Sequence, residues 1–457
     1  MFLREVGMKL RFFGLALSIC LAAGAGAQSK SGPSNAHFDK GTALLEKGDL
    51  DGAIAEFREA IRIKPDFADG HYNLGVALDA KGDLTSATAE YRTAIRWRPD
   101  YAEAHANLGH ALDLQGDHEA AVRECREAVR LAPGLALTHV NLGLALMGKG
   151  DPEGAMAQYR EAVRLDPHFA TGRNDLGEAL YSKGDLAGAM PEFREAIRLD
   201  PSYAEPHSNL GNALADKGDL DGAIAEFREA IQLKPDLAEP HFNLGNVLRA
   251  KGDSESAITE YHQAIQLKPE FFEAHYNLGV TLADGGDLDG AMSEYRTAIR
   301  LRPDSAEVHN NLGTVLDRRH DLDGALAEFR AAIRLKDDYP EAHNNLAVTL
   351  SESGDLTGAI AEFHKALLLR PDSDDILTGL VAAHLKENDL NGAIAECREA
   401  LKLKSDNANA HYTLGNLFEK SADLKSASAE YQTACKLAGG DSYMCGAAER
   451  LAPKSIP

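Results

Sequence analysis

Apolar and polar residues alternate along this chain with the spacing of helices. In residues 68–99, Leu74 and Leu78 form one apolar stripe, and Tyr91 and Ala94 form a second. Polar residues fill the positions between them, so apolar side chains recur every three or four residues. This pattern predicts two amphipathic helices, each with one face turned toward a core.

The predicted helix pair recurs every 34 residues. Twelve consecutive copies fit without an insertion or deletion, from Ser34 to Asp441. Because the spacing never changes, each copy is expected to be one structural unit stacked on the copy before it. The 457 residues are therefore expected to form one all-helical body of repeats, not several separate globular domains.

Residues at fixed positions, counted from the first residue of each copy, mark the helix ends. Glycine at position 15, such as Gly82, suits the left-handed conformation that ends a helix. Aspartate occupies position 16 in all twelve copies, from Asp49 to Asp423, where it can accept hydrogen bonds from the next helix's free amides. Proline at position 32, such as Pro99, ends the second helix. Alanine at positions 20 and 27 of every copy predicts closely packed helices.

The motif H-x2-L-G-x2-L, followed by A-x3-[FY]-x2-A and then P, resembles the tetratricopeptide repeat. The resemblance covers residues 34–441. It implies an all-α solenoid in which antiparallel helix pairs wind into a right-handed superhelix, with the first helices lining a concave groove. Residues 442–457 are expected to form a capping helix and a tail.

The sequence contains no motif that predicts catalysis. There is no glycine loop of the kind that holds phosphates, no serine nucleophile elbow and no His-Glu-x-x-His helix. Outside the repeats, no segment is large enough for a catalytic domain. We therefore expect a protein that is not an enzyme and has no cofactor.

Ten of the seventeen histidines share position 4: His37, His71, His105, His139, His207, His241, His275, His309, His343 and His411. They can fill a half-buried slot, sense pH or bind a metal. A metal site is disfavoured, because neighbouring helices pack about 8–10 Å apart whereas metal–imidazole bonds are about 2 Å long.

Asparagine recurs at position 6 and is the best candidate for a binding role. The eight residues are Asn73, Asn107, Asn141, Asn209, Asn243, Asn277, Asn311 and Asn345. This row resembles the asparagine ladder in the superhelix of O-linked N-acetylglucosamine transferase, which grips the backbone of an extended polypeptide. That enzyme's catalytic domain is absent here. The alternative is that these asparagines only stabilise contacts between helices.

Two cysteines lie close to each other near the C-terminal end of the chain. Cys435 occupies an apolar position of the last repeat, and Cys445 lies in the short segment that follows. A disulfide between them is one interpretation, since the glycines between them allow a tight reversal of the chain. Two buried thiols are the other.

Residues 1–27 have the order of a secretory signal peptide. Lys9 and Arg11 precede an apolar run that ends in small residues at Ala27. A retained membrane anchor is disfavoured because the run is short. We therefore expect export to the periplasm or the outside of the cell, with residues 28–33 as a short linker.

The acidic charge of the chain limits its partners. The formal net charge is −23, and it becomes −25 when residues 1–27, with three basic and one acidic side chain, are removed. Such acidity disfavours nucleic acid and anionic membrane surfaces and favours basic or neutral proteins and peptides. No stable membrane insertion is expected after cleavage.

These observations favour an exported scaffold that holds extended polypeptide segments in its concave groove. Two other hypotheses remain. The chain could be a non-catalytic subunit of an envelope machine that assembles or exports an exopolysaccharide or a pilus. It could also be the substrate receptor of a separate glycosyltransferase.

Overall fold

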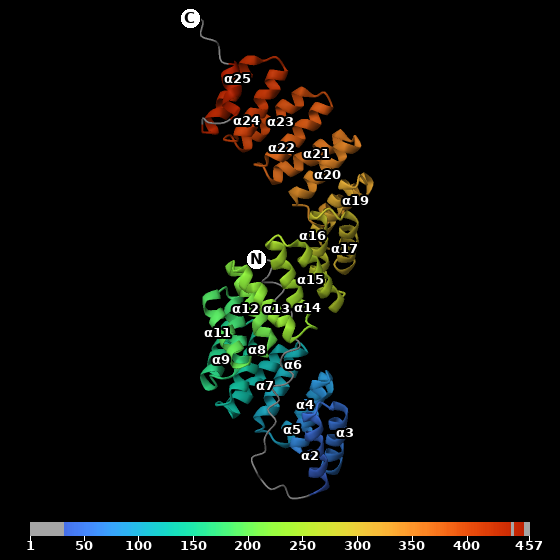
Figure 1. Cartoon of the computed structure of the whole chain (residues 1–457), viewed down its shortest axis with the longest axis vertical. Helices are drawn as coiled ribbons and strands as arrows, with labels where there is room; N and C mark the ends of the chain where they lie inside the picture. Colours follow the sequence, from blue (N-terminus) through green and yellow to red (C-terminus); the bar gives the residue numbers. More distant parts are fainter. Residues whose placement is uncertain (1–31, 440–442, 452–457) are drawn as a thin grey trace. The chain divides into compact units, whose positions relative to one another are not determined.

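A computed structural model describes residues 32–439 and 443–451, and within these residues every regular element is a helix. The prediction of an all-α solenoid built from helix pairs is confirmed (Figure 1). The described part of the chain divides into two compact units, one that ends at Val247 and one that begins at Leu248. The predicted signal peptide lies outside the described residues, as do residues 28–31 of the predicted linker.

The first unit contains the helices α2 (Pro33–Glu46), α3 (Leu50–Ile63), α4 (Ala68–Ala80), α5 (Leu84–Trp97), α6 (Ala102–Leu114), α7 (His118–Leu131), α8 (Ala136–Gly148), α9 (Pro152–Leu165), α10 (Ala170–Ser182), α11 (Leu186–Leu199), α12 (Ala204–Lys217) and α13 (Leu220–Leu233). Helix α14 (Ala238–Ala250) contains the boundary between the units. The second unit contains α15 (Ser254–Leu267), α16 (Phe272–Asp284), α17 (Leu288–Leu301), α18 (Ala306–Arg318), α19 (Leu322–Leu335), α20 (Pro340–Ser353), α21 (Leu356–Leu369), α22 (Asp374–Lys386), α23 (Leu390–Leu403), α24 (Ala408–Lys420), α25 (Leu424–Leu437) and α26 (Tyr443–Leu451).

Each repeat forms one pair of helices. From α4 onward, the first helix of a pair begins at position 1 of its repeat, and every second helix begins at position 17. Only two or three residues join the helices of a pair, so the two helices must run in opposite directions to pack along their lengths. Four residues join each pair to the next.

The aspartate at position 16 caps every second helix, as its chemistry predicts. For example, the Asp219 carboxylate accepts a hydrogen bond from the Gly222 amide at 3.0 Å. The residue before it has a positive φ, which is 85° at Gly82. Glycine adopts this left-handed conformation without strain, but Ala422 occupies the same position with φ 63°.

Small residues bring the two helices of a pair together. Ala87 and Ala94 are completely buried, as is the ring of Tyr91 between them. A Cβ atom on Gly75, at position 8 of the first helix, would lie 2.6 Å from Cε1 of this ring. The glycine therefore makes room for the aromatic ring, and this contact recurs in most repeats of both units.

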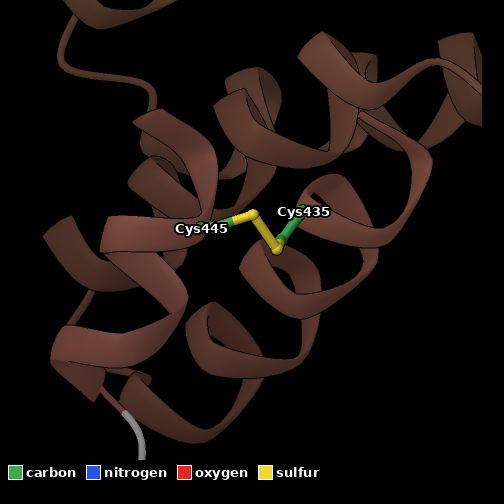
Figure 2. The surroundings of a disulfide bond; sticks show 2 residues. All are labelled: Cys435 and Cys445. Carbon is green, nitrogen blue, oxygen red and sulfur yellow. A yellow bond between two sulfur atoms is a disulfide. The ribbon is translucent and has the colours of Figure 1, made fainter. Parts of the chain in front are cut away.

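Helix α26 covers the C-terminal end of the second unit. A disulfide joins Cys435, in the last turn of α25, to Cys445, in the first turn of α26, with 4.7 Å between their Cα atoms (Figure 2). Met444 and Ala448 of α26 are buried. Of the two interpretations of these cysteines, the structure contains the disulfide. No helix in residues 32–439 or 443–451 has the length and apolarity needed to cross a membrane.

Candidate functional site

The position-6 residues point away from the second helix of their own repeat. Position 8 faces that helix, as the contact between Gly75 and Tyr91 shows. Position 6 comes two residues earlier, which is a rotation of about 200° around the helix. We call the surface that carries these residues the asparagine face. In the first unit it comprises Asn73, Asn107, Asn141, Asn209 and Asn243, and in the second unit Asn277, Asn311 and Asn345.

In the first unit Asn107, Asn141 and Asn209 connect consecutive repeats. The amide nitrogen of Asn107 donates a hydrogen bond to the Tyr72 hydroxyl at 3.2 Å. The amide nitrogen of Asn141 donates to the backbone oxygen of Ala106 at 3.2 Å. In each case the acceptor belongs to position 5 of the preceding repeat, 35 residues earlier. Part of each side chain's hydrogen-bonding capacity is thus used inside the stack.

The second unit repeats this arrangement with the same spacing. The amide nitrogen of Asn311 donates to the Tyr276 hydroxyl at 3.1 Å. That of Asn345 donates to the side-chain oxygen of Asn310 at 3.1 Å. Because the carboxamide is held from one side, its orientation is set before any ligand arrives. Such preorganisation reduces the entropy lost on binding.

The asparagines differ in how accessible they are. Asn73 and Asn141 are buried, whereas the other six are half-buried. A carboxamide has two N–H donors and one acceptor oxygen, so a single hydrogen bond within the stack leaves the oxygen and one N–H for other partners. The Asn141 oxygen is buried and has no hydrogen-bond partner among the described residues. The structure shows the contacts between helices that the alternative interpretation expects, and a binding role for this row stays a prediction.

Acidic side chains flank the asparagine face. Position 2 lies one helical turn before position 6 and on the same side of the helix. It is acidic in eight repeats, at Asp69, Glu103, Glu205, Glu239, Glu273, Glu307, Glu341 and Asp375. Some of these carboxylates form ion pairs with basic residues of the same repeat, such as Asp69 with Arg98 at 2.8 Å and Glu273 with Arg302 at 2.8 Å.

The position-4 histidines make specific polar contacts that sequence reasoning missed. Nδ1 of His71 lies 2.6 Å from Oε2 of Glu90, and its Nε2 lies 3.0 Å from the carbonyl oxygen of Pro65. Equivalent histidine–glutamate contacts of 2.5 to 2.7 Å are His37–Glu56, His105–Glu124, His207–Glu226, His275–Glu294, His309–Glu328, His343–Glu362 and His411–Glu430. Glutamate at position 23, present in eleven of the twelve repeats, was the available signal.

The other two cysteines of the repeats are buried thiols. Cys125 and Cys397 are both completely buried and lie in different units. Burial raises the pKa of Cys125 well above its usual range and raises the pKa of Cys397 to about 12. At neutral pH both remain protonated and weakly nucleophilic. Within residues 32–439 and 443–451, no group of histidine, cysteine, aspartate and glutamate is arranged to hold a metal ion.

Sequence models of known families match most of the chain. A model described as TPR repeat matches residues 41–82, 77–116, 211–249, 245–284, 281–317 and 382–421. Two models described as tetratricopeptide repeat match residues 140–204, 310–376 and 102–135. The chain belongs to the tetratricopeptide repeat family. Tetratricopeptide repeats support the prediction that the protein is a scaffold for protein–protein interaction, with proteins or peptides as partners. The tetratricopeptide repeat fold is generally non-catalytic.

Solved structures of other tetratricopeptide repeat proteins are similar to parts of this one. YrrB, described as a TPR protein with an unusual peptide-binding site, is 24% identical over 40% of this chain and 95% of its own, with a TM-score of 0.37. MamA is 25% identical over 37% of this chain and 92% of its own, with a TM-score of 0.35. A chain of the Cut9–Hcn1 hetero-tetramer of APC/C is 14% identical over 93% of this chain and 97% of its own, with a TM-score of 0.40. Among curated proteins there is no match.

Proposed function

We propose that this tetratricopeptide repeat protein is an exported scaffold that holds extended polypeptide segments on its asparagine face. The observation that carries this proposal is the recurrence of half-buried, oriented carboxamides at one position of successive repeats. A carboxamide offers a donor and an acceptor, which match the two polar groups of a peptide unit whatever its side chain is. Each such bond contributes about 0.5–1.5 kcal/mol net, so useful affinity needs several asparagines together.

The charge of the chain supports a basic or neutral ligand. The acidic residues at position 2 lie one turn from the asparagines, and the chain as a whole carries a formal net charge of −23. Opposite charges accelerate the encounter of partners, whereas like charges facing each other oppose binding. A basic unfolded chain should therefore bind more tightly than an acidic one of similar length, and salt should reduce the difference.

The asparagine face can be tested in the second unit with matched controls. Replacing Asn277, Asn311 and Asn345 together by alanine would remove three peptide-binding carboxamides. Three bonds of about 0.5–1.5 kcal/mol amount to a loss of tenfold or more in affinity. The ligand is reduced lysozyme alkylated with iodoacetamide, a basic unfolded polypeptide, and binding is measured by fluorescence anisotropy. Reduced and carboxymethylated α-lactalbumin serves as the acidic comparison.

Two control variants separate binding from stability. Tyr276→Phe removes the hydroxyl that accepts the Asn311 hydrogen bond but keeps every asparagine. It should lower stability slightly and change affinity much less than the triple variant does. Arg296→Ala alters an exposed side chain on the second helix of the same repeat and should leave affinity unchanged. If the triple variant binds like the parent, or if all three variants weaken binding equally, the asparagine face is not the binding site.

Export rests on the N-terminal sequence. The basic residues before the apolar run and the small residues before Gln28 support cleavage at that point. Mass spectrometry of the protein from cell fractions should find an N-terminus near Gln28 in the periplasm or the medium. Recovery of the protein in the cytoplasm with its N-terminal 27 residues still attached would refute export.

A further inference from the structure

Both ring nitrogens of several position-4 histidines face hydrogen-bond acceptors, whereas the Nε2 of His207 is buried without a partner among the described residues. In the first unit, His71 lies between the Glu90 carboxylate and the carbonyl of Pro65, and His105 lies between Glu124 and the carbonyl of Pro99 at 2.7 and 3.2 Å. A neutral imidazole has only one N–H, so one nitrogen would turn a lone pair toward an oxygen. Only the imidazolium ion, with two N–H groups, can donate to both acceptors.

The same geometry occurs in the second unit. Nδ1 of His309 lies 2.6 Å from the Glu328 carboxylate, and its Nε2 lies 3.4 Å from the carbonyl of Pro303. In all three repeats the glutamate belongs to the second helix of the histidine's own repeat. The carbonyl belongs to the end of the preceding repeat, six residues before the histidine. Each histidine therefore connects two consecutive repeats.

One repeat places a permanent cation in the same position. Arg173 occupies position 4 of α10, where its Nη1 donates to the Glu192 carboxylate at 2.7 Å and its Nε donates to the carbonyl of Pro167 at 3.1 Å. These acceptors are equivalent to those of the histidines, at the same sequence separations of 19 and 6 residues. Arginine is always protonated, so in this repeat the position holds a cation.

We propose that His71, His105 and His309 are imidazolium ions that tie consecutive repeats together, so that the stack of repeats loosens when rising pH removes their protons. The tie depends on the glutamate, the histidine and the carbonyl of the preceding repeat. It is independent of whether the asparagine face binds a polypeptide.

The groups around each ring favour its protonated form. Burial alone would lower the pKa of His71, but the bonds to Glu90 and to the carbonyl of Pro65 outweigh it and raise the pKa. Burial would also lower the pKa of His105, but the bonds to Glu124 and to the carbonyl of Pro99 outweigh it and raise the pKa, with a smaller contribution from Glu127.

The surroundings of His309 include charges of both signs. The hydrogen bond with Glu328 makes the largest contribution and raises the pKa of His309. Burial and Arg334 lower this pKa, but they do not outweigh the hydrogen bond, so the pKa of His309 is raised. A raised pKa in the folded state means that the stabilisation is complete below the ordinary histidine pKa of about 6.5. It is lost as pH rises through the higher folded value.

The chain supplies templates for the test. The triple variant His71→Arg, His105→Arg and His309→Arg copies the arrangement of Arg173 and keeps a cation at every pH. The matched control is His262→Arg, because His262 is an exposed histidine at position 25, where nine other repeats have arginine. Thermal unfolding is followed by circular dichroism at several pH values from about pH 6 to about pH 8.5.

The parent protein and the control should show the same fall in Tm over this range, on the order of 3–6 °C. The triple variant should fall less, because its three ties no longer titrate. A second variant, Glu90→Gln, Glu124→Gln and Glu328→Gln, copies the natural pair His139 and Gln158, whose Nδ1–Oε1 distance is 2.8 Å. This variant should have a lower Tm than the parent near pH 6 and a smaller fall in Tm as the pH rises.

Nuclear magnetic resonance of the folded parent protein tests the protonation directly. With nitrogen-15 in the histidine rings, the signals of His71, His105 and His309 are assigned by their loss in the arginine variants. These rings should keep both protons at pH values above the ordinary histidine pKa of about 6.5. Rings that are neutral near pH 6, or a triple variant whose Tm falls as steeply as that of the parent, would overturn the proposal.

Discussion

The repeats fill the space between their two helices in different ways, which allows a sharp test of the packing. In most repeats, glycine at position 8 faces an aromatic ring at position 24. In repeat 9, a Cβ atom on Gly313 would lie 2.6 Å from Cε1 of Phe329. Repeat 11 instead has Val381 and Cys397 at these positions, and both are buried. In repeat 11 the larger side chain of the pair is on the first helix, whereas in repeat 9 it is on the second.

Changing one partner alone should be costly. Cys397→Phe would force a ring against Val381 in a core that is already filled, which typically costs 1–3 kcal/mol. Val381→Gly would lose about 1.5–3 kcal/mol of apolar burial and roughly 0.3–0.5 kcal/mol of helix propensity. The double variant recreates the pair of Gly313 and Phe329. Its loss of unfolding free energy should therefore be smaller than the sum of the single losses by about 2 kcal/mol.

The assay is guanidinium unfolding followed by circular dichroism. Because long repeat arrays need not unfold in one step, hydrogen exchange of the amides in α22 and α23 supplies the local free energy of opening. The parent and the three variants form a complete double-mutant cycle. Losses that add within about 0.5 kcal/mol would show that Val381 and Cys397 do not share one packing site, and the reasoning would be wrong.

Three further measurements test local features. In protein that begins at Gln28, thiol counting under denaturing, non-reducing conditions should find two free thiols, and four free thiols would disprove the bond between Cys435 and Cys445. Reducing this bond should lower the unfolding free energy by about 2–3 kcal/mol. Hydrogen bonds from Ser426 lower the pKa of Asp423, so amide protection at the start of α25 should persist well below pH 7 and disappear as pH falls through that pKa. Asp423→Asn should make this protection independent of pH, and an unchanged pH profile would contradict the cap. Ala422→Gly should stabilise the last helix pair by about 1 kcal/mol, because Ala422 has φ 63°; a lower Tm would contradict that.

Much of the fold could be predicted because its causes are local. An aspartate caps a helix through amides three residues away, as Asp219 does with Gly222, and glycine ends a helix through its own backbone. The spacing of apolar residues defines which side of each helix is buried. A constant period of 34 residues then implies that each pair meets the next in the same way.

The partners of the polar side chains were decided by the tertiary structure. The sequence places Asn107 on one side of its helix, but its hydrogen bond to Tyr72 depends on the distance between two first helices that are 35 residues apart in the chain. The contact of His71 with Glu90 likewise depends on how the two helices of a pair are rotated against each other. Hydrogen bonds form only within about 3 Å and in a narrow range of angles. Sequence periodicity defines a side of a helix much less finely than that, so it identified the candidate residues but not the atoms that they contact.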